Sequence, residues 1–572
     1  MDIGKTPVPE GMAKLAPILR QTTTKFLTEY SYQLYQEIVY TDKKLSAYQN
    51  TYWEEYVEIQ ARMVGILFAI TTVLMASLVL ANILVGVFYD TDHFGDTLFI
   101  LGAGWRTTQG LTPVVDFGDF YGGVIANGIG VTMRLFGSDV FAFDRFTLLL
   151  LAGLSLSATA ILRARMSFAG LMALFLTFAV LMLSRYPLET DAPIVRIFST
   201  HSFLYNRFGL ALLLVSGLFV ALRASTDTND FLPGILIGLL VVLAALTKPT
   251  FIVLAPGVLL GLALQQRWKS LAAVLIGMGA SVAIFDPTLQ KWLGSLIYIQ
   301  AHLGTEVSAD IGALLRKAVQ LPLSQPIATT FALAALGVVI AARTDLAAVL
   351  SLLIVAGAGI GMATSMGGNG NLGQLSIVVA ILVALAAGEI ARRSRLRNAS
   401  SVQAVAFLLV VSLAFPHLLN LAAATLEGFA RRDQMLISEG PYARYLSLPE
   451  NANKQGEPTQ YEMLADGIAS LHALGEPSQW GIIADHGITF EHAVLAQPVP
   501  GYPLWQRPTA PELAEGKPIA PEVDIVMLGR SGPDEVGEIL AAKLSNEFAL
   551  CTTSTHWAIH VRRSSAIDCQ GN

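Results

Sequence analysis

Long apolar segments recur through most of this chain and constrain its fold more than any other feature. The first runs from Met63 to Phe88, which exceeds the about 20 residues that a helix needs to cross a bilayer. The chain is 53% hydrophobic and only 14% charged, against roughly 25% charged in soluble proteins. Because a soluble core has no use for so much apolar sequence, the chain is predicted to be an all-α polytopic membrane protein.

The apolar segments predict about eleven transmembrane helices within residues 61–426. The predicted spans cover residues 63–88, 142–162, 167–184, 208–223, 231–247, 250–266, 270–285, 326–343, 346–364, 373–391 and 402–425. The two spans that meet at Lys248 and Pro249 are also compatible with one re-entrant feature. An odd number of spans puts the two termini on opposite sides of the membrane.

Basic residues in short loops set the orientation, because they favour the cytoplasmic side. One set of alternate loops holds Arg163, Arg165, Arg223, Arg267, Lys269, Arg343, Arg392, Arg393, Arg395 and Arg397. The other set holds most of the acids: Asp90, Asp92, Asp96, Asp116, Asp119, Asp139, Asp144, Glu189, Asp191, Asp286, Glu306 and Asp310. We therefore expect a multi-pass protein of the inner (plasma) membrane. Its N-terminus is expected in the cytoplasm and its C-terminal tail outside, which in a Gram-negative bacterium means the periplasm.

Two more polar regions flank the spans. Residues 1–60 contain recurring aromatic residues and are predicted to form a cytoplasmic amphipathic segment on the membrane or on the protein body. A solvated lead-in helix is the alternative. Residues 427–572 are predicted to form a small α/β domain. Its expected elements are helices over 461–474 and 533–544, short buried strands over 480–485 and 523–528, and a hairpin over 548–561.

The only two cysteines, Cys551 and Cys569, fall in this C-terminal domain. On the periplasmic side a disulfide between them is one expectation, because that compartment is oxidising. An unpaired Cys569 in a terminal tail is the other. The cysteine count provides no CxxC or Cys/His zinc site.

The loop between the first two spans, residues 89–140, is rich in aspartates. Asp92 and Asp96 are four residues apart and share one face if this stretch is helical. Asp116 and Asp119 lie in a turn with Gly and Pro, and Arg106 is the nearest counter-ion in the sequence. These acids are either solvated, with Asp116 and Asp119 capping the next helix, or they form a functional site.

The order of features in this loop resembles the GT-C superfamily of membrane glycosyltransferases. Asp96 stands fourteen residues before Gly110, and a turn containing Pro113, Asp116 and Phe117 follows. A surface helix over 121–136, a Leu-Phe-Gly turn and the second span come next. The family's usual acidic pair is replaced here by Asp96 and Thr97, so Asp92 competes with Asp96 for that position.

The resemblance implies an inverting sugar transfer outside the cytoplasm, from a polyprenyl-phosphate-linked donor to a glycan, lipid or protein acceptor. Such a reaction needs a carboxylate base for the acceptor hydroxyl, and the resemblance assigns it to Asp96 or to Asp92. It also needs positive charge or a metal at the leaving phosphate. Asp116 and Asp119 are expected to support the base or to bind a divalent metal, Mg or Mn. No other cofactor is expected.

Three cations are candidates for binding the donor phosphate: Arg207, Lys248 and Arg106. Arg207 lies where the chain re-enters the bilayer, and Lys248 lies between two apolar spans. The alternative for both is an interfacial anchor whose charge reaches the headgroups. His201 is a lone histidine for which we expect a structural role.

Two other classes of function remain open. A membrane transporter or lipid flippase predicts internal repeats and charged residues in the middle of spans, and neither is evident. A non-catalytic envelope-assembly protein has no need for the aspartates. The net charge of −6 argues against a nucleic-acid partner.

Overall fold

The computed structural model of this chain is mostly helical. It describes residues 48–569 except 92–93, 120–122, 186–200, 202–203, 224–229, 304–315, 317–319, 321–322, 324, 342–345, 365–369, 395, 397–398, 448–458, 502–512, 514–516, 531–533 and 545–546. Most of the predicted N-terminal segment, residues 1–47, thus lies outside the described part, as does Asp92.

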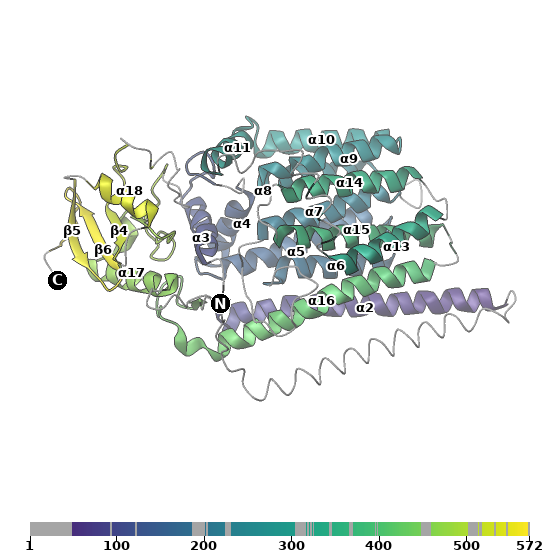
Figure 1. Cartoon of the computed structure of the whole chain (residues 1–572), viewed down its shortest axis with the longest axis horizontal. Helices are drawn as coiled ribbons and strands as arrows, with labels where there is room; N and C mark the ends of the chain where they lie inside the picture. Colours follow the sequence, from purple (N-terminus) through teal and green to yellow (C-terminus); the bar gives the residue numbers. More distant parts are fainter. Residues whose placement is uncertain are drawn as a thin grey trace.

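The long helices form one bundle whose axes run in roughly the same direction (Figure 1). They are α2 (Tyr48–Val85), α5 (Ala142–Leu162), α6 (Phe168–Leu183), α7 (Leu204–Ala221), α8 (Phe231–Thr247), α9 (Leu254–Leu264), α10 (Trp268–Phe285), α13 (Pro326–Ala341), α14 (Leu346–Thr364), α15 (Gly370–Arg393) and α16 (Ala399–Ala430). The short 3₁₀ helix η1 (Pro249–Val253) joins α8 to α9.

Within the described residues, 6 helices are long and apolar enough to cross a membrane: α2, α5, α7, α10, α15 and α16. The shorter apolar helices include α6, α8, α9 with η1, α13 and α14, so every predicted span contains a helix. The prediction of a polytopic helical membrane protein is confirmed. The first span differs at its end, because the helix stops at Val85 and Phe88 belongs to a strand.

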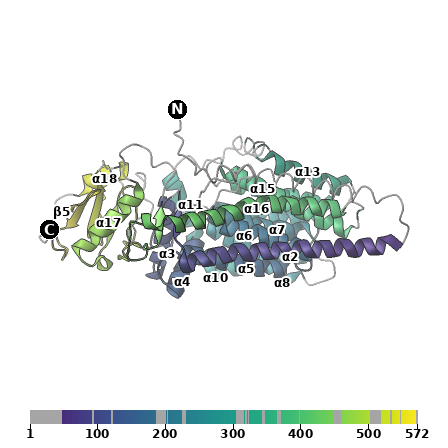
Figure 2. The same cartoon turned by 90° about the horizontal axis from the view of Figure 1, so that it is seen from below.

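Burial separates the centre of the bundle from its lipid-facing surface. The apolar window of α7 is 100% buried and that of α15 is 89% buried, whereas that of α2 is only 22% buried. Helix α2 has 38 residues, so at about 1.5 Å per residue it is longer than the about 30 Å hydrocarbon core. Accordingly, it projects beyond the other helices at the end away from the strands (Figures 1 and 2).

Helices α8 and α10 approach each other closely because glycines face each other across the contact. A Cβ on Gly238 would lie 2.3 Å from the carbonyl oxygen of Val274, and one on Gly277 would lie 2.2 Å from that of Ile235. Any side chain at either position would force the helices apart. Small residues serve this purpose in membrane helix packing.

A small α/β domain lies at one end of the bundle, which we call the domain end (Figure 1). It contains α17 (Gln460–Leu474), α18 (Glu535–Lys543) and a sheet of strand order β3-β4-β6-β5. Strands β3 (Ile482–Ala484) and β4 (Ile525–Gly529) are parallel, and β5 (Phe548–Thr553) and β6 (Trp557–Arg562) form an antiparallel hairpin against β4. The prediction of a small C-terminal α/β domain is confirmed.

Helices α3 (Phe94–Thr108), α4 (Val124–Phe136) and α11 (Gln290–Leu303) lie between this domain and the bundle (Figure 1). Helix α4 lies within the surface helix predicted over 121–136. It buries Ile125, Ile129 and Met133, while Leu135 and Phe136 remain exposed. That distribution is expected of an amphipathic helix at a membrane interface.

A two-stranded parallel sheet joins the exit of the first span to the chain beyond the last span. Strand β1 (Phe88–Asp90) pairs with β2 (Tyr445–Ser447), with Phe88 opposite Tyr445. The preceding residue, Arg444, donates hydrogen bonds to the carbonyl oxygens of Asn82, Ile83 and Gly86 at the end of α2. One guanidinium group thereby bonds two of the last four carbonyl groups of α2, which a helix end leaves unpaired.

Candidate functional site

Ionisable side chains from four segments meet at the domain end of the bundle. Asp90 lies on β1, Asp144 lies in the first turn of α5, Arg185 follows α6, and His201 precedes α7. All four are buried, with at most 5% of any residue exposed. Buried charges are costly unless they are paired, so this arrangement requires mutual neutralisation.

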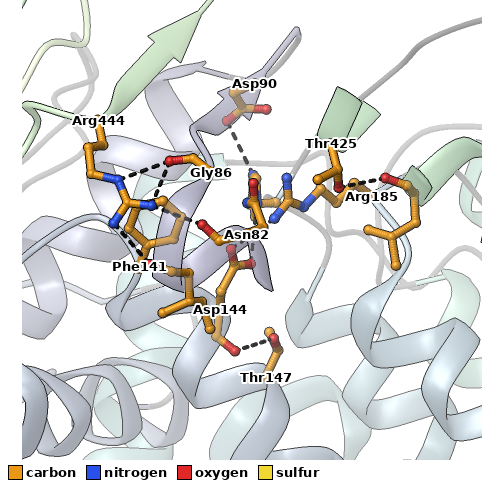
Figure 3. Close-up of polar contacts among 12 residues, drawn as sticks. Asn82, Gly86, Asp90, Phe141, Asp144, Thr147, Arg185, Thr425 and Arg444 are labelled. Carbon is orange, nitrogen blue, oxygen red and sulfur yellow. Dashed lines mark hydrogen bonds and ion pairs between the residues drawn. The ribbon is translucent and has the colours of Figure 1, made fainter. Parts of the chain in front are cut away.

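Asp144 and Arg185 form the central ion pair. Arg185 Nη2 lies 2.8 Å from Asp144 Oδ2, and the guanidinium also lies 5.9 Å from the ring of Phe88. Asp144 benefits from its place in the first turn of α5, because a helix N-terminus favours negative charge. Figure 3 shows this pair beside Asp90, with Arg444 holding Asn82 and Gly86 nearby.

The imidazole of His201 lies between two carboxylates. Its Nδ1 is 3.7 Å from Asp90 Oδ2, and its Nε2 is 3.6 Å from Asp144 Oδ1. These separations exceed hydrogen-bond length, so a shift of less than about 1 Å would make either bond. The ring stacks on Phe88 at 4.0 Å between centroids and meets Phe143 edge-on. The aromatic packing holds the ring between the two acids.

Asp90 connects this cluster to α3. Its Oδ2 accepts a hydrogen bond of 2.6 Å from the hydroxyl of Thr97 in the first turns of that helix. Tyr445, the first residue of β2, lies close enough for the charge of Asp90 to affect the pKa of its phenol. Burial, with a smaller contribution from Asp90, raises the pKa of Tyr445 well above its ordinary value, so the phenol stays protonated.

A small pocket, with room for about one water molecule, lies beside the cluster. Its polar lining is Asp144, Thr147, Ser184, Arg185, His201 and Arg207. Arg207 donates a hydrogen bond to the carbonyl oxygen of Ser184, and the Ser184 hydroxyl lies 2.6 Å from His417 Nδ1. Two guanidinium groups, a carboxylate and an imidazole thus line one cavity.

Lys248 lies near the same turn of α7 as Arg207. It follows the last residue of α8, and its Nζ is 3.4 Å from Oδ1 of Asn206, the neighbour of Arg207. The ammonium also lies 5.3 Å from the ring of Tyr205 and 5.9 Å from that of Phe251. The structure therefore brings together two of the three cations predicted to bind a phosphate.

The third cation, Arg106 on α3, faces the C-terminal domain. Its Nε and Nη2 donate hydrogen bonds of 2.7 and 2.6 Å to the two carboxylate oxygens of Glu491. The guanidinium lies 5.3 Å from the ring of Phe117, and both charged side chains are almost fully buried. Its predicted contact with a phosphate stays a prediction, and that contact would require this pair to open.

The predicted aspartates occupy three different settings. Asp96 is half-buried in the first turn of α3. Asp116 accepts a 2.7 Å hydrogen bond from the backbone N–H of Thr112 and so stabilises its own turn. Asp119 is buried, 1% exposed. Among the described residues, no group of three His, Cys, Asp or Glu side chains is spaced to hold a metal ion. Asp92 is outside that set, so the divalent metal stays a prediction.

Sequence reasoning gave no role to four charged residues of this region: Asp90, Asp144, Arg185 and Glu491. The two aspartates were visible as outer acids, and Arg185 and Glu491 were not singled out. Their partners were not visible, because Arg185 lies 41 positions from Asp144 and Glu491 lies 385 from Arg106. His201 packs against aromatic rings, which fits the structural role expected of it, and it also lies near two carboxylates.

Cys551 and Cys569 are joined by a disulfide in the structure. Cys551 lies on β5, and the bond ties the end of the chain back to the sheet. The disulfide therefore fixes Cys569 to the C-terminal domain.

No family model and no curated protein sequence matches the chain. Among solved structures, the crystal structure of ArnT from Cupriavidus metallidurans bound to undecaprenyl phosphate is similar to it, with 11% sequence identity and a TM-score of 0.47. The similar region covers 88% of this chain and 98% of that chain. The identity and the score are both low, and neither the fold family nor the activity of this chain follows from them.

Proposed function

We propose that this chain is a GT-C-like glycosyltransferase that moves a sugar from a polyprenyl-phosphate-linked donor to an extracytoplasmic glycan, lipid or protein acceptor. The domain end of the bundle then faces the periplasm, and the N-terminus lies in the cytoplasm. The transfer is inverting, because the acceptor hydroxyl attacks the anomeric carbon directly while the phosphate leaves. The order of features in the aspartate loop and the chemistry of the pocket support this proposal.

The observation that carries the proposal is the pocket at the domain end, where Arg185 and Arg207 meet Asp144 and His201. A donor whose tail stays in the bilayer presents its phosphate at this depth. Fixed cations there stabilise the charge that develops on the leaving phosphate. Lys248, beside Asn206, adds a third positive charge close to Arg207.

The carboxylates supply the other half of the reaction. A base must accept the proton of the acceptor hydroxyl, and we assign it to Asp96, with Asp92 as the competitor. Asp90 is a further candidate, because its Oδ2 lies 3.7 Å from His201, which lines the pocket. All three belong to the segment that follows the first span.

Asp116 and Asp119 are proposed to support this base or to bind a divalent metal. Carboxylate oxygens suit Mg and Mn, although Asp116 also holds the turn at Thr112. Removal of divalent ions with a chelator, followed by addition of Mg or Mn, separates these roles. Transfer that stops and returns supports the metal, and unchanged transfer assigns the two residues to structure.

The test uses the purified protein in detergent, a radiolabelled polyprenyl-phosphate sugar, and extracts that contain glycan, lipid or protein acceptors. Removing a general base typically costs about 10²–10⁴-fold in rate, so Asp96→Asn should lose that much turnover with donor binding retained. Asp92→Asn and Asp90→Asn should lose less. If Asp90→Asn or Asp92→Asn is the inactive variant, the base is reassigned to it. If the wild-type protein releases no sugar from any donor, the proposed function fails.

A further inference from the structure

The C-terminal domain binds the helix that carries Asp96 through a buried ion pair. Arg106 lies on α3, and Glu491 lies in the turn that follows β3. Both hydrogen bonds of the pair, 2.7 and 2.6 Å, connect a planar guanidinium to a planar carboxylate. Such bidentate pairs fix orientation as well as distance.

Glu491 is itself held in place by contacts of its own carboxylate and of the next residue. The backbone N–H of Val499 donates to Glu491 Oε1 at 3.3 Å, and the next residue, His492, bonds to the carbonyl oxygen of Ser138 through Nε2 at 3.1 Å. The side chains of Glu491 and Arg106 are 3% and 2% exposed. A carboxylate buried this deeply has little freedom to follow a moving partner.

Further contacts run along the same face of α3. Trp105 Nε1 donates to the carbonyl oxygen of Ala496 at 2.9 Å, and the Thr489 hydroxyl lies 3.4 Å from the carbonyl oxygen of Leu98. The backbone N–H of Gly501 donates to the carbonyl oxygen of Asp116 at 2.8 Å. The domain thus contacts both helix α3 and the following turn.

The opposite side of α3 faces the charged cluster. On this side, the Thr97 hydroxyl donates a hydrogen bond to Asp90. Asp90 lies beside His201, which in turn lies beside Asp144. Any tilt of α3 therefore moves Asp96 relative to the pocket and strains the hydrogen bond from Thr97 to Asp90. The bonds along the domain face set this tilt.

We propose that Glu491, acting through Arg106, is a positioning residue that holds the aspartate-bearing helix α3 in register with the pocket. This inference rests on the proposed function. In this role, the C-terminal domain sets the geometry of the active site. It can therefore affect the rate of transfer without contacting the donor. A misplacement of about 1 Å, caused far from the chemistry, can cost about 10²-fold in rate.

The test compares Glu491→Gln with a matched control in the same domain. Asp466→Asn removes a carboxylate that accepts hydrogen bonds from the Ser554 hydroxyl at 2.6 Å and from the His556 N–H at 2.8 Å, away from α3. Because Glu491→Gln removes the negative charge opposite Arg106, the double variant Arg106→Met with Glu491→Leu is included. Replacing a buried ion pair by apolar residues often preserves stability.

Both Glu491 variants should lower kcat by about tenfold to hundredfold per folded molecule. Glu491→Gln, which keeps Arg106, should leave the KM for the donor within about twofold of wild type. Asp466→Asn should leave kcat unchanged even where it lowers the thermal stability. Unchanged kcat in both Glu491 variants, or an equal loss in Asp466→Asn, would overturn the inference.

A second readout keeps the inference testable if the protein transfers no sugar at all. Hydrogen exchange of the α3 amides, residues 94–108, should be faster in Glu491→Gln than in Asp466→Asn at equal global stability. Equal exchange in the two variants would show that the ion pair does not hold the helix. Absent transfer by the wild-type protein, in contrast, counts only against the proposed function.

Discussion

The guanidinium of Arg185 lies 2.8 Å from the carboxylate of Asp144, and both side chains are buried where α5 begins and α6 ends. The two residues come from adjacent helices, so the pair joins those helices at the mouth of the pocket. A buried pair of this kind contributes little net stability compared with apolar residues of the same volume. Its presence at this depth is better explained by a need for charge at the pocket.

Removing one partner of this pair should be far more costly than removing both. Asp144→Asn leaves the Arg185 charge uncompensated and is expected to lower the free energy of unfolding by about 3–5 kcal/mol. The double variant Asp144→Asn with Arg185→Met should recover most of that loss and still be inactive in transfer. Thermal unfolding in detergent and the transfer assay measure the two effects. A double variant as unstable as the single one would contradict the expected coupling.

Much of the fold was predictable because membrane helices and amphipathic helices have strong sequence periods. The apolar windows placed the spans, and the order of features in the aspartate loop, read through the family resemblance, placed the surface helix that α4 occupies. The end of the first span was not predictable. Phe88 is as apolar as the preceding helix, and only its pairing with Tyr445, far along the chain, makes it part of a strand.

The site was less predictable than the fold, because it depends on contacts between distant segments. Spacing within the loop singled out Asp96, but nothing local in the sequence connects Asp90 to His201 or Arg106 to Glu491. The sequence shows which residues carry charge. Which charges face each other depends on the tertiary packing of helices.

Arg207 and Lys248 should both contribute to donor binding. A hydrogen bond to a charged group contributes about 1.5–3 kcal/mol, so Arg207→Met and Lys248→Met should each weaken donor affinity by roughly tenfold to hundredfold. Arg163→Met, at an exposed position at the other end of the bundle, is the control and should bind normally. Titration with a polyprenyl-phosphate sugar measures all three. Normal affinity in both site variants would assign these cations to anchoring.

The orientation of the chain can be tested with two reporter fusions, one after Arg395 and one after Gln570. The basic loop around Arg392 and Arg393 is expected in the cytoplasm, and the C-terminal domain in the periplasm. A reporter that is active only in the periplasm should therefore be inactive at the first position and active at the second. Equal activity at both positions would rule out the eleven-span arrangement.

The contact between the C-terminal domain and the membrane body should weaken in acid because of His492. Burial lowers the pKa of this histidine to about 4 from its ordinary value of 6.5. The neutral ring donates from Nε2 to the carbonyl oxygen of Ser138, and its Nδ1 lies 3.2 Å from the Tyr442 hydroxyl. Above pH 6.5 both the folded and unfolded states hold the ring neutral, and the contribution of His492 is constant.

As the pH falls below 6.5, the unfolded chain binds a proton that the folded domain binds only near pH 4. Stability should therefore fall between these values, by up to about 3 kcal/mol. Asp485 acts in the opposite sense, because burial raises its pKa to about 6 and its contribution is lost as the pH rises through that value. Comparing wild type with His492→Gln isolates the histidine, since both keep Asp485. Thermal scans from pH 7 to pH 4 should show a shallower loss for His492→Gln, whereas parallel curves would rule out titration of His492 as the cause.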